Sequence, residues 1–217
     1  MDFISHLLHL NLYLPQFLNH YGIWAYGILF LIIFLETGLV LTPFLPGDSL
    51  LFTLGALLIN THRQADIQLG IQPGTPPIYL IIFLLILAAF LGDNLNYYLG
   101  RYCLNFFKIN HKINPKYLQK THDFYTRHGA MTLIFARFIP IIRTFAPFAA
   151  GIGKMHYLKF VLISFLAAVL WINLLFFLGY FFGDIPWVKN NFTLSILIII
   201  FFSLLPSFLP LFKKIKK

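Results

Sequence analysis

The stretch FLETGLVLTPFLPGDSLLF, residues 34–52, places two acidic side chains in an otherwise apolar run. Glu36 is the only glutamate among 217 residues, and Asp48 is the next acidic residue along the chain. A charge at the centre of a bilayer costs at least about 2.5–3.5 kcal/mol, and acids at such positions usually serve a function. The stretch therefore indicates a site, provided that the surrounding chain lies in a membrane.

The composition indicates an integral membrane protein. Of the 217 residues, 59% are hydrophobic and 11% are charged, whereas soluble domains have about one half and about one quarter. A helix needs about 20 mainly apolar residues to cross a bilayer. Three long apolar runs satisfy this requirement and predict spanning helices at 78–102, 157–183 and 192–212. We therefore expect an all-α membrane protein.

Two further apolar runs, 21–59 and 129–153, are interrupted by helix-breaking residues. Proline lacks a backbone N–H and glycine permits a sharp reversal, so both can end or bend a helix. Irregular backbone at membrane depth is tolerated only inside protein or beside a water-filled cavity. We expect a helical hairpin in each run, with breaks at Pro43, Pro46 and Gly47 in the first and at Pro140, Pro147 and Gly151 in the second.

The net charge of +9 is unevenly distributed and predicts the topology. Lysine and arginine gather in the segment 103–128 and in the tail 213–217, which we expect to be cytoplasmic because cytoplasmic loops carry the excess of basic residues. The run 129–153 then begins and ends on the cytoplasmic side, so it is predicted to be re-entrant. The charge pattern does not decide whether the run 21–59 spans the membrane or is re-entrant; if it is re-entrant, it enters from the opposite face, after an interfacial helix at 1–20. Because the charge lies at the membrane edges, we expect no nucleic-acid partner.

A short internal repeat supports two opposed halves. NLNYYLG (94–100) closes the predicted span 78–102, and NLLFFLG (173–179) closes the span 157–183. The charge-based topology runs these two helices in opposite directions, which is the inverted-repeat plan of many secondary transporters. The expected architecture is one membrane domain at 21–183, an inverted repeat of two opposed re-entrant helical hairpins plus spanning helices.

The cytoplasmic connector has helix signals of its own. Asn114 and Pro115 are typical of an N-cap and a first helical residue, and Gly129 follows the last basic turn. We expect a short surface helix that ends at Gly129.

The second hairpin supplies positive charges opposite the carboxylates of the first. Arg137 and Arg143 stay charged and can hold a phosphate or a carboxylate in a bidentate fork. We expect both arginines to bind an anionic head group, and we expect Glu36 and Asp48 to exchange protons. A structural ion-pair lock between the hairpins is the alternative that the sequence leaves open.

Other polar residues lie on the predicted spanning helices. They are expected to line the same cavity or to form interhelical hydrogen bonds. These residues are Asp93, Asn94, Asn96 and Asn173.

The sequence predicts no metal site. The histidines are scattered, and there is no HExxH motif or Cys/His cluster, so we expect neither a metal nor another cofactor.

Three motifs give the chain a resemblance to a known family. LETGLVLTPFLPGDSLL (35–51), GDNLNYYLGR (92–101) and ARFIPIIRTFAPFAAGIGKM (136–155) resemble the DedA family of bacterial inner-membrane proteins, whose shared region is also called the SNARE-associated or VTT domain. The resemblance covers about 21–183. It implies two opposed re-entrant hairpins and the movement of lipids between leaflets, linked to the proton motive force. The acids that the family requires would fall on Glu36 and Asp48, and its arginines on Arg137 and Arg143.

The expected function is transport of an anionic lipid or a lipid-phosphate carrier, such as undecaprenyl phosphate or a phospholipid, with protons as the coupling ion. The expected partners are membrane lipids and protons, and the sequence leaves a homo-oligomer open. A membrane enzyme acting on lipid phosphates is an alternative, but it would need a nucleophile or a metal site that the sequence does not display. A structural or chaperone-like protein of the cell envelope is the other alternative.

Overall fold

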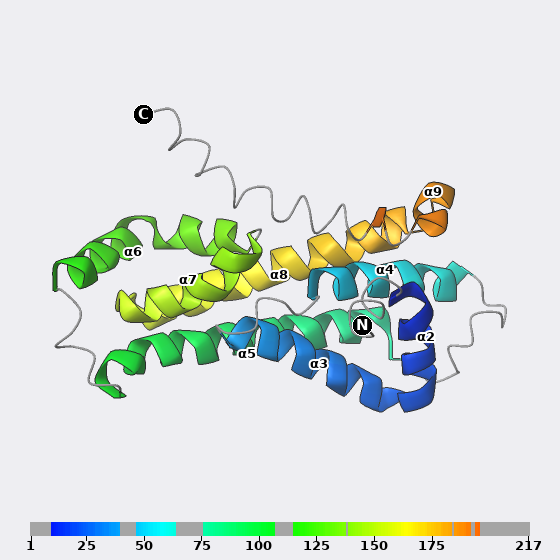
Figure 1. Ribbon diagram of the computed structural model, residues 1–217, viewed down its shortest axis with the longest axis horizontal. Coiled ribbons are helices and arrows are strands. Elements are labelled where there is room, and N and C mark those ends of the chain that lie inside the picture. The colour runs from blue at the N-terminus through cyan, green and yellow to red at the C-terminus, as the bar shows by residue number, and fades with distance from the viewer. Residues whose placement is uncertain are drawn as a thin grey trace. The chain divides into compact units, whose positions relative to one another are not determined.

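A computed structural model describes residues 10–39, 47–63, 76–106, 115–137, 139–183, 185–191 and 194–195. The regular elements within these residues are helices, which Figure 1 shows in chain order. Their bounds are α2 (Leu10–Tyr21), α3 (Ile23–Gly38), α4 (Gly47–Arg63), α5 (Ile78–Phe106), α6 (Pro115–Ala136), α7 (Pro140–Ile152), α8 (Tyr157–Phe182) and α9 (Pro186–Asn190).

The described residues belong to two compact units. The first unit takes the described parts of 1–32, 46–85 and 172–203, and the second takes those of 33–45 and 86–171. The helices α3, α5 and α8 each contribute one part to the first unit and the other part to the second. Each unit is therefore built from segments that are distant in the sequence.

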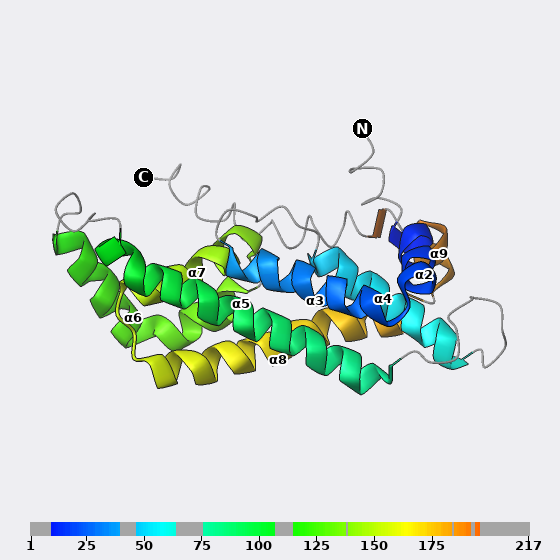
Figure 2. The same ribbon diagram turned by 90° about the horizontal axis from the view of Figure 1, so that it is seen from below.

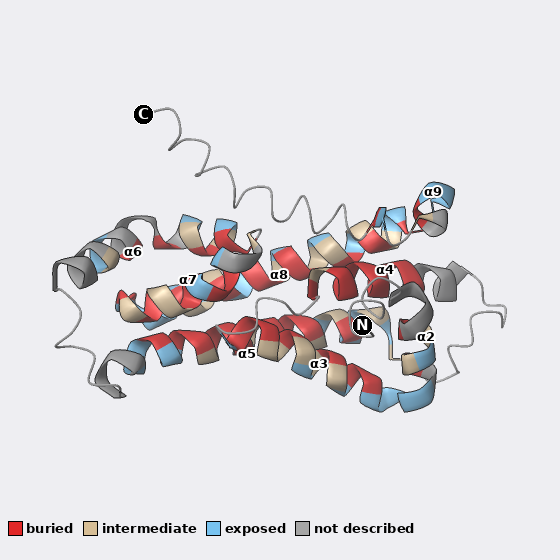
Figure 3. Ribbon diagram, viewed as in Figure 1, coloured by how far each residue is buried: buried red, intermediate tan, exposed pale blue. Residues whose placement is uncertain are grey.

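The helices α5 and α8 are long and apolar enough to cross a membrane, over Ile78–Tyr102 and Tyr157–Phe182. The helices predicted at 78–102 and 157–183 are thereby confirmed. Only 33% of the most apolar window of each is buried, whereas a core helix of a soluble protein is mostly buried. Figure 3 shows exposed residues between buried ones along α8. Leucines four positions apart form one exposed apolar face of this helix, at Leu158, Leu162, Leu166, Leu170 and Leu174.

In the first unit, α2 packs on α4, and α4 crosses the last turns of α8 at backbone distance. A Cβ atom at Gly55 would lie 2.0 Å from the carbonyl oxygen of Phe176. A Cβ atom at Gly179 would lie 2.0 Å from the carbonyl oxygen of Phe52. Glycine is therefore required on both helices, because small residues let membrane helices approach closely.

The same contact recurs in the second unit, between α5 and α7. A Cβ atom at Gly100 would lie 2.1 Å from the carbonyl oxygen of Phe148, and one at Gly151 would lie 2.1 Å from that of Tyr97. Tyr97 and Gly100 occupy the positions in NLNYYLG that Phe176 and Gly179 hold in NLLFFLG. The repeat noticed in the sequence thus corresponds to one kind of helix crossing, found once in each unit.

The helix α6 differs from the expected connector helix. It begins at Pro115 as predicted, but it continues through Gly129 to Ala136, so the predicted boundary at 128/129 falls inside a helix. Gly129 is buried, and a Cβ atom there would lie 3.2 Å from the sulfur of Met155. This glycine makes room for a packing contact, and the expectation of a helix end there was wrong.

The second interruption lies between α6 and α7, which pack against each other (Figure 2). Pro140 is in the first turn of α7, where its missing N–H is not needed. Pro147 was expected at a break, but α7 continues through it. Gly151 lies in the last turn of α7.

The first interruption falls between the end of α3 at Gly38 and the start of α4 at Gly47. Pro43 and Pro46 lie outside the described residues, as does most of the predicted span 192–212. The interfacial helix expected at 1–20 corresponds in its described part to α2.

We expect Gly151→Ala and Gly179→Ala each to lower the melting temperature of the purified protein by several degrees. The added methyl group meets a carbonyl oxygen, and overpacking of this kind costs about 1–3 kcal/mol. Gly27→Ala in α3 is the matched control, because a Cβ atom at Gly27 would meet no atom within 4 Å and alanine favours the helix. Thermal unfolding in detergent measures the three variants, and equal melting temperatures would contradict the crossing geometry.

Candidate functional site

Two ion pairs are buried in the second unit. Arg143 of α7 donates to the carboxylate of Glu36 in α3. Arg137 donates to the carboxylate of Asp93 in α5. All four residues are at most 4% exposed. Charges at such depth persist only when they are paired and hydrogen-bonded. One pair therefore joins α7 to α3, and the other joins the turn after α6 to α5.

The helix interruption places both arginines. Arg137 follows the last residue of α6, where its N–H bonds to the carbonyl of Ile134 at 3.3 Å. Ile139 then adopts an extended conformation with φ −122° and ψ 105°, before α7 begins. Arg143 lies in the first turn of α7, and its N–H bonds to the carbonyl of Ile139 at 2.8 Å. The two arginines are six positions apart in the sequence, and the chain turns between them.

One aromatic ring receives both arginines. The Cζ atom of Arg143 lies 4.4 Å from the ring centroid of Trp171 in α8, and that of Arg137 lies 5.9 Å from it. An arginine over an indole ring is attracted by the negative face of the ring, and the attraction exceeds about 2 kcal/mol where water is excluded. Trp171 is 2% exposed, so this contact stabilises two positive charges in a buried position.

A polar layer surrounds the pair of Asp93 and Arg137. The hydroxyl of Ser164 in α8 donates to the same carboxylate oxygen of Asp93 that receives Arg137. Arg137 also donates to the backbone carbonyl of Ser164 at 3.3 Å. Ser164 and Trp171 are seven positions apart and therefore lie on one face of α8. This face is the one that α8 turns toward the charges.

Asn96 connects α3 and α7, the helices that contain the ion pair of Glu36 and Arg143. Its amide nitrogen donates to the carbonyl of Thr37 in α3 at 3.2 Å and to that of Thr144 in α7 at 2.6 Å. These two residues directly follow Glu36 and Arg143 in the chain. The helix α5 thus fixes the backbone next to both charged residues. A Cβ atom at Gly92 of α5 would lie 2.0 Å from the hydroxyl oxygen of Thr37, so α3 and α5 are closely packed here.

Two buried polar atoms of the site have no hydrogen-bond partner among the described residues. They are Nη1 of Arg137 and Oδ1 of Asn96. Burying a donor without an acceptor costs about 1–3 kcal/mol, and more for a charged group. A guanidinium nitrogen of this kind is suited to receive an oxygen atom of a ligand or of water.

The structure brings together three of the four residues that the sequence placed at the site, namely Glu36, Arg137 and Arg143. The fourth, Asp48, is the second residue of α4; it is partly exposed and belongs to the first unit. Its role stays a prediction. Asp93, expected to line a cavity or to form interhelical hydrogen bonds, is the ion-pair partner of Arg137.

Of the three asparagines expected to line the cavity, one belongs to the site. Asn96 belongs to the site, whereas Asn94 accepts a hydrogen bond from the hydroxyl of Tyr157 at 3.0 Å and donates to the carbonyl of Phe90. Asn173 lies in the part of α8 that belongs to the first unit. Sequence reasoning missed Ser164 and Trp171, and the only signal for them is their shared face on an apolar helix.

The arrangement suits the exchange of oxyanions. Each guanidinium group holds one carboxylate, and another oxyanion can replace that carboxylate if the carboxylate takes up a proton. Within the described ranges, no group of three histidine, cysteine, aspartate or glutamate side chains is arranged to hold a metal ion.

Comparisons with known proteins agree with this picture of a membrane protein. The VTT domain matches residues 45–181, a range that contains Asp93, Arg137 and Arg143. The chain is 44% identical over 213 residues to Protein DedA of Escherichia coli strain K12, which covers 97% of this chain and 92% of that protein.

Two further relatives are more distant. The uncharacterized membrane protein Rv0364 of Mycobacterium tuberculosis is 40% identical over 184 residues, covering 83% of this chain and 75% of that protein. Inner membrane protein YqjA of Escherichia coli strain K12 is 35% identical over 164 residues, covering 74% and 69%. No solved structure matches the chain. The domain match and the near full-length identity together show that the chain belongs to the DedA family of membrane proteins, which carry the VTT domain.

Proposed function

We propose that the chain transports a phosphate-bearing lipid between the leaflets of a bacterial inner membrane and couples this movement to protons. The main support for the proposal is that two ion pairs, Arg143 with Glu36 and Arg137 with Asp93, are buried among the apolar helices of the second unit. A purely apolar path would repel a phosphate head group, whereas two guanidinium groups can hold one in bidentate contacts.

The proposed cycle exchanges one anion for another. When Glu36 takes up a proton, its carboxylate becomes neutral and Arg143 loses the charge that balanced it. A phosphate oxygen of the lipid then replaces the carboxylate at Arg143, while the acyl chains stay in hydrocarbon. When Glu36 releases the proton, the carboxylate competes again for Arg143 and the head group leaves. One proton is thus bound and released for each head group.

The pair of Asp93 and Arg137 is proposed to be the second contact of the head group. Nη1 of Arg137 has no acceptor among the described residues, so it can bind a phosphate oxygen without giving up its bond to Asp93. Ser164 keeps Asp93 hydrogen-bonded during the exchange.

We further propose that two opposed re-entrant hairpins form an inverted repeat around this site, with a cytoplasmic C-terminus. Two observations support this arrangement: helices interrupted between α3 and α4 and between α6 and α7, and the equivalent glycine crossings of the two units. The name of the relative YqjA, an inner membrane protein, supports the membrane assignment. We propose a transporter rather than an enzyme, because Glu36 and Asp93 are each paired with an arginine that would compete with a catalytic metal ion.

We expect Glu36→Gln and Arg143→Ala each to lower lipid transfer between leaflets by about tenfold or more, since each removes one partner of the exchange. In the unchanged protein, a pH gradient across the membrane is expected to change the transfer rate, and in Glu36→Gln it is not. The assay is leaflet transfer of fluorescent anionic phospholipid in proteoliposomes. Arg63→Ala in α4 is the control, because it removes a guanidinium group of the first unit. Transfer by Glu36→Gln at the original rate would contradict the proposed role.

A structural lock makes a different prediction from an oxyanion fork. Loss of one partner of a buried pair costs about 3–5 kcal/mol, so stability must be measured alongside transfer. We expect Arg143→Lys to keep most of the thermal stability but to lose most of the transfer, because an ammonium group cannot form the bidentate fork. The double variant Glu36→Gln/Arg143→Gln, which buries no unpaired charge, should likewise fold but not transfer. If Arg143→Lys transfers lipid normally, the arginine serves as a lock.

A further inference from the structure

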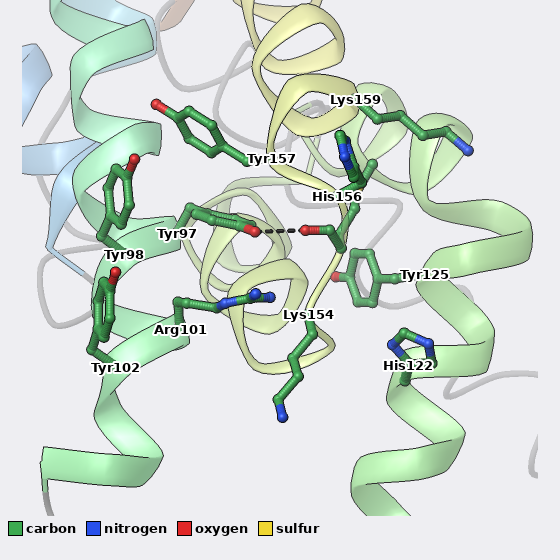
Figure 4. A pocket seen from close by; sticks show the side chains of 11 residues that line it. Tyr97, Tyr98, Arg101, Tyr102, His122, Tyr125, Lys154, His156, Tyr157 and Lys159 are labelled. Carbon is green, nitrogen blue, oxygen red and sulfur yellow. Dashed lines mark hydrogen bonds between the residues drawn. The ribbon is translucent and has the colours of Figure 1, made fainter.

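The second unit contains a cavity of about 720 Å³ that none of the four ion-pair residues lines. It is an open pocket, lined by the last turns of α5, by α6 and by the turn between α7 and α8 (Figure 4). It lies where one candidate span ends at Tyr102 and the other begins at Tyr157. Tyrosine is enriched at the level of the lipid head groups. The cavity is therefore at the edge of the membrane-spanning part, where head groups are expected.

The charge around the cavity has one sign. Arg101, Lys154 and Lys159 line it together with two histidines, and no carboxylate is among the described residues that do so. Figure 4 shows Arg101 reaching from α5 toward the turn that carries Lys154, with Lys159 farther out on α8. The first N–H groups of a helix also favour anions, and α8 begins at Tyr157 on the cavity wall. Three cationic residues and the start of a helix thus line one pocket.

The turn that carries Lys154 has a defined backbone geometry. Met155 bonds to the carbonyl of Ala150 at 3.0 Å, and Lys154 bonds to that of Gly151 at 3.1 Å, which is the pattern of a Schellman motif. Lys154 occupies the left-handed position of this motif with φ 52°, and it is the only residue other than glycine with positive φ among the described residues. Glycine is the usual residue there, because a side chain costs about 1–2 kcal/mol. The motif therefore fixes the backbone of Lys154 at the wall of the cavity.

The cavity wall is preorganised by hydrogen bonds. The hydroxyl of Tyr97 donates to the carbonyl of Met155 at 2.6 Å, which joins α5 to the turn (Figure 4). Nδ1 of His122 in α6 lies 2.7 Å from the carbonyl of Gly153, so this nitrogen must carry the proton. The hydroxyl of Tyr125 donates to the carbonyl of Ala146 at 3.1 Å, and burial raises the pKa of Tyr125 to about 12, so the hydroxyl stays a donor. These hydrogen bonds hold α5, α6 and the turn between α7 and α8 in place around the cavity.

We infer that this cavity is a binding site for the phosphate group of an anionic lipid, with Arg101 and Lys154 as its direct ligands and Lys159 at its edge. The tyrosines at the cavity, Tyr98, Tyr102 and Tyr157, would contact the glycerol region of the lipid. The chemistry that the site recognises is a phosphate oxyanion, which free phosphate shares. The inference concerns binding alone, and it holds whether or not the chain transfers lipid.

The test is equilibrium binding to the full-length protein in neutral detergent, with short-chain phosphatidic acid, short-chain phosphatidylcholine and inorganic phosphate as separate probes. We expect phosphatidic acid to bind at least about tenfold more tightly than phosphatidylcholine, whose ammonium group cancels the charge of its phosphate. Inorganic phosphate is expected to compete only weakly. If it binds as tightly as phosphatidic acid, the phosphate site stands and its source is free phosphate.

The variant Lys154→Gly separates binding from structure. It removes the ammonium group and relieves the positive φ, so we expect the melting temperature to stay equal or rise while phosphatidic acid binds about tenfold more weakly. Arg101→Gln should weaken binding to a similar extent. Lys154→Arg, which keeps the charge, and Lys189→Gly, which removes a charge from α9 in the first unit, should stay within about twofold of the original affinity.

Two results would overturn the inference. One is unchanged phosphatidic acid binding by Lys154→Gly together with Arg101→Gln. The other is an equal loss of affinity in Lys189→Gly, which would show that net charge alone attracts the lipid.

Discussion

The structure depends on the pairing of buried guanidinium groups with buried carboxylates. Removal of an ion from water into a low-dielectric interior costs several kcal/mol, even after relaxation. Interactions with residues of other helices offset this cost. Glu36 pairs with Arg143, Asp93 pairs with Arg137, and the ring of Trp171 contacts both arginines. Because these partners lie on α3, α5, α7 and α8, the charges also determine how four helices of the second unit pack.

The same interaction is the basis of the proposed exchange. Two positive and two negative charges cancel, so the resting arrangement is neutral if both acids are ionised. A single proton on one acid leaves one arginine without a compensating charge in a buried position, and an incoming phosphate restores neutrality. The polar residues around the pairs, Asn96 and Ser164, keep the backbone and the second carboxylate in place during such an exchange.

The sequence predicts much of the fold and the charged residues of the site. The spans of α5 and α8 follow from uninterrupted apolar runs, and Glu36, Arg137 and Arg143 stand out because charges are rare there. The sequence predicts that acids of the first hairpin meet arginines of the second, and Glu36 and Arg143 do so. It could not assign the partners or predict Asp93 as one of them, since the paired residues are 107 and 44 positions apart and depend on helix rotation. Trp171 has no distinguishing signal on an apolar helix. Gly129 looked like a helix end because a glycine that ends a helix and one that packs inside it have the same sequence context.

The central claim is that a phosphate head group takes the place of the Glu36 carboxylate at Arg143 when Glu36 is protonated. Infrared difference spectroscopy of the reconstituted protein tests it directly, by comparing spectra before and after addition of phosphatidic acid. We expect a protonated carboxylic acid band to appear with the lipid and to be absent in Glu36→Gln. A lipid that binds without such a band, or with a band that Glu36→Gln leaves unchanged, would show that the head group does not replace the Glu36 carboxylate.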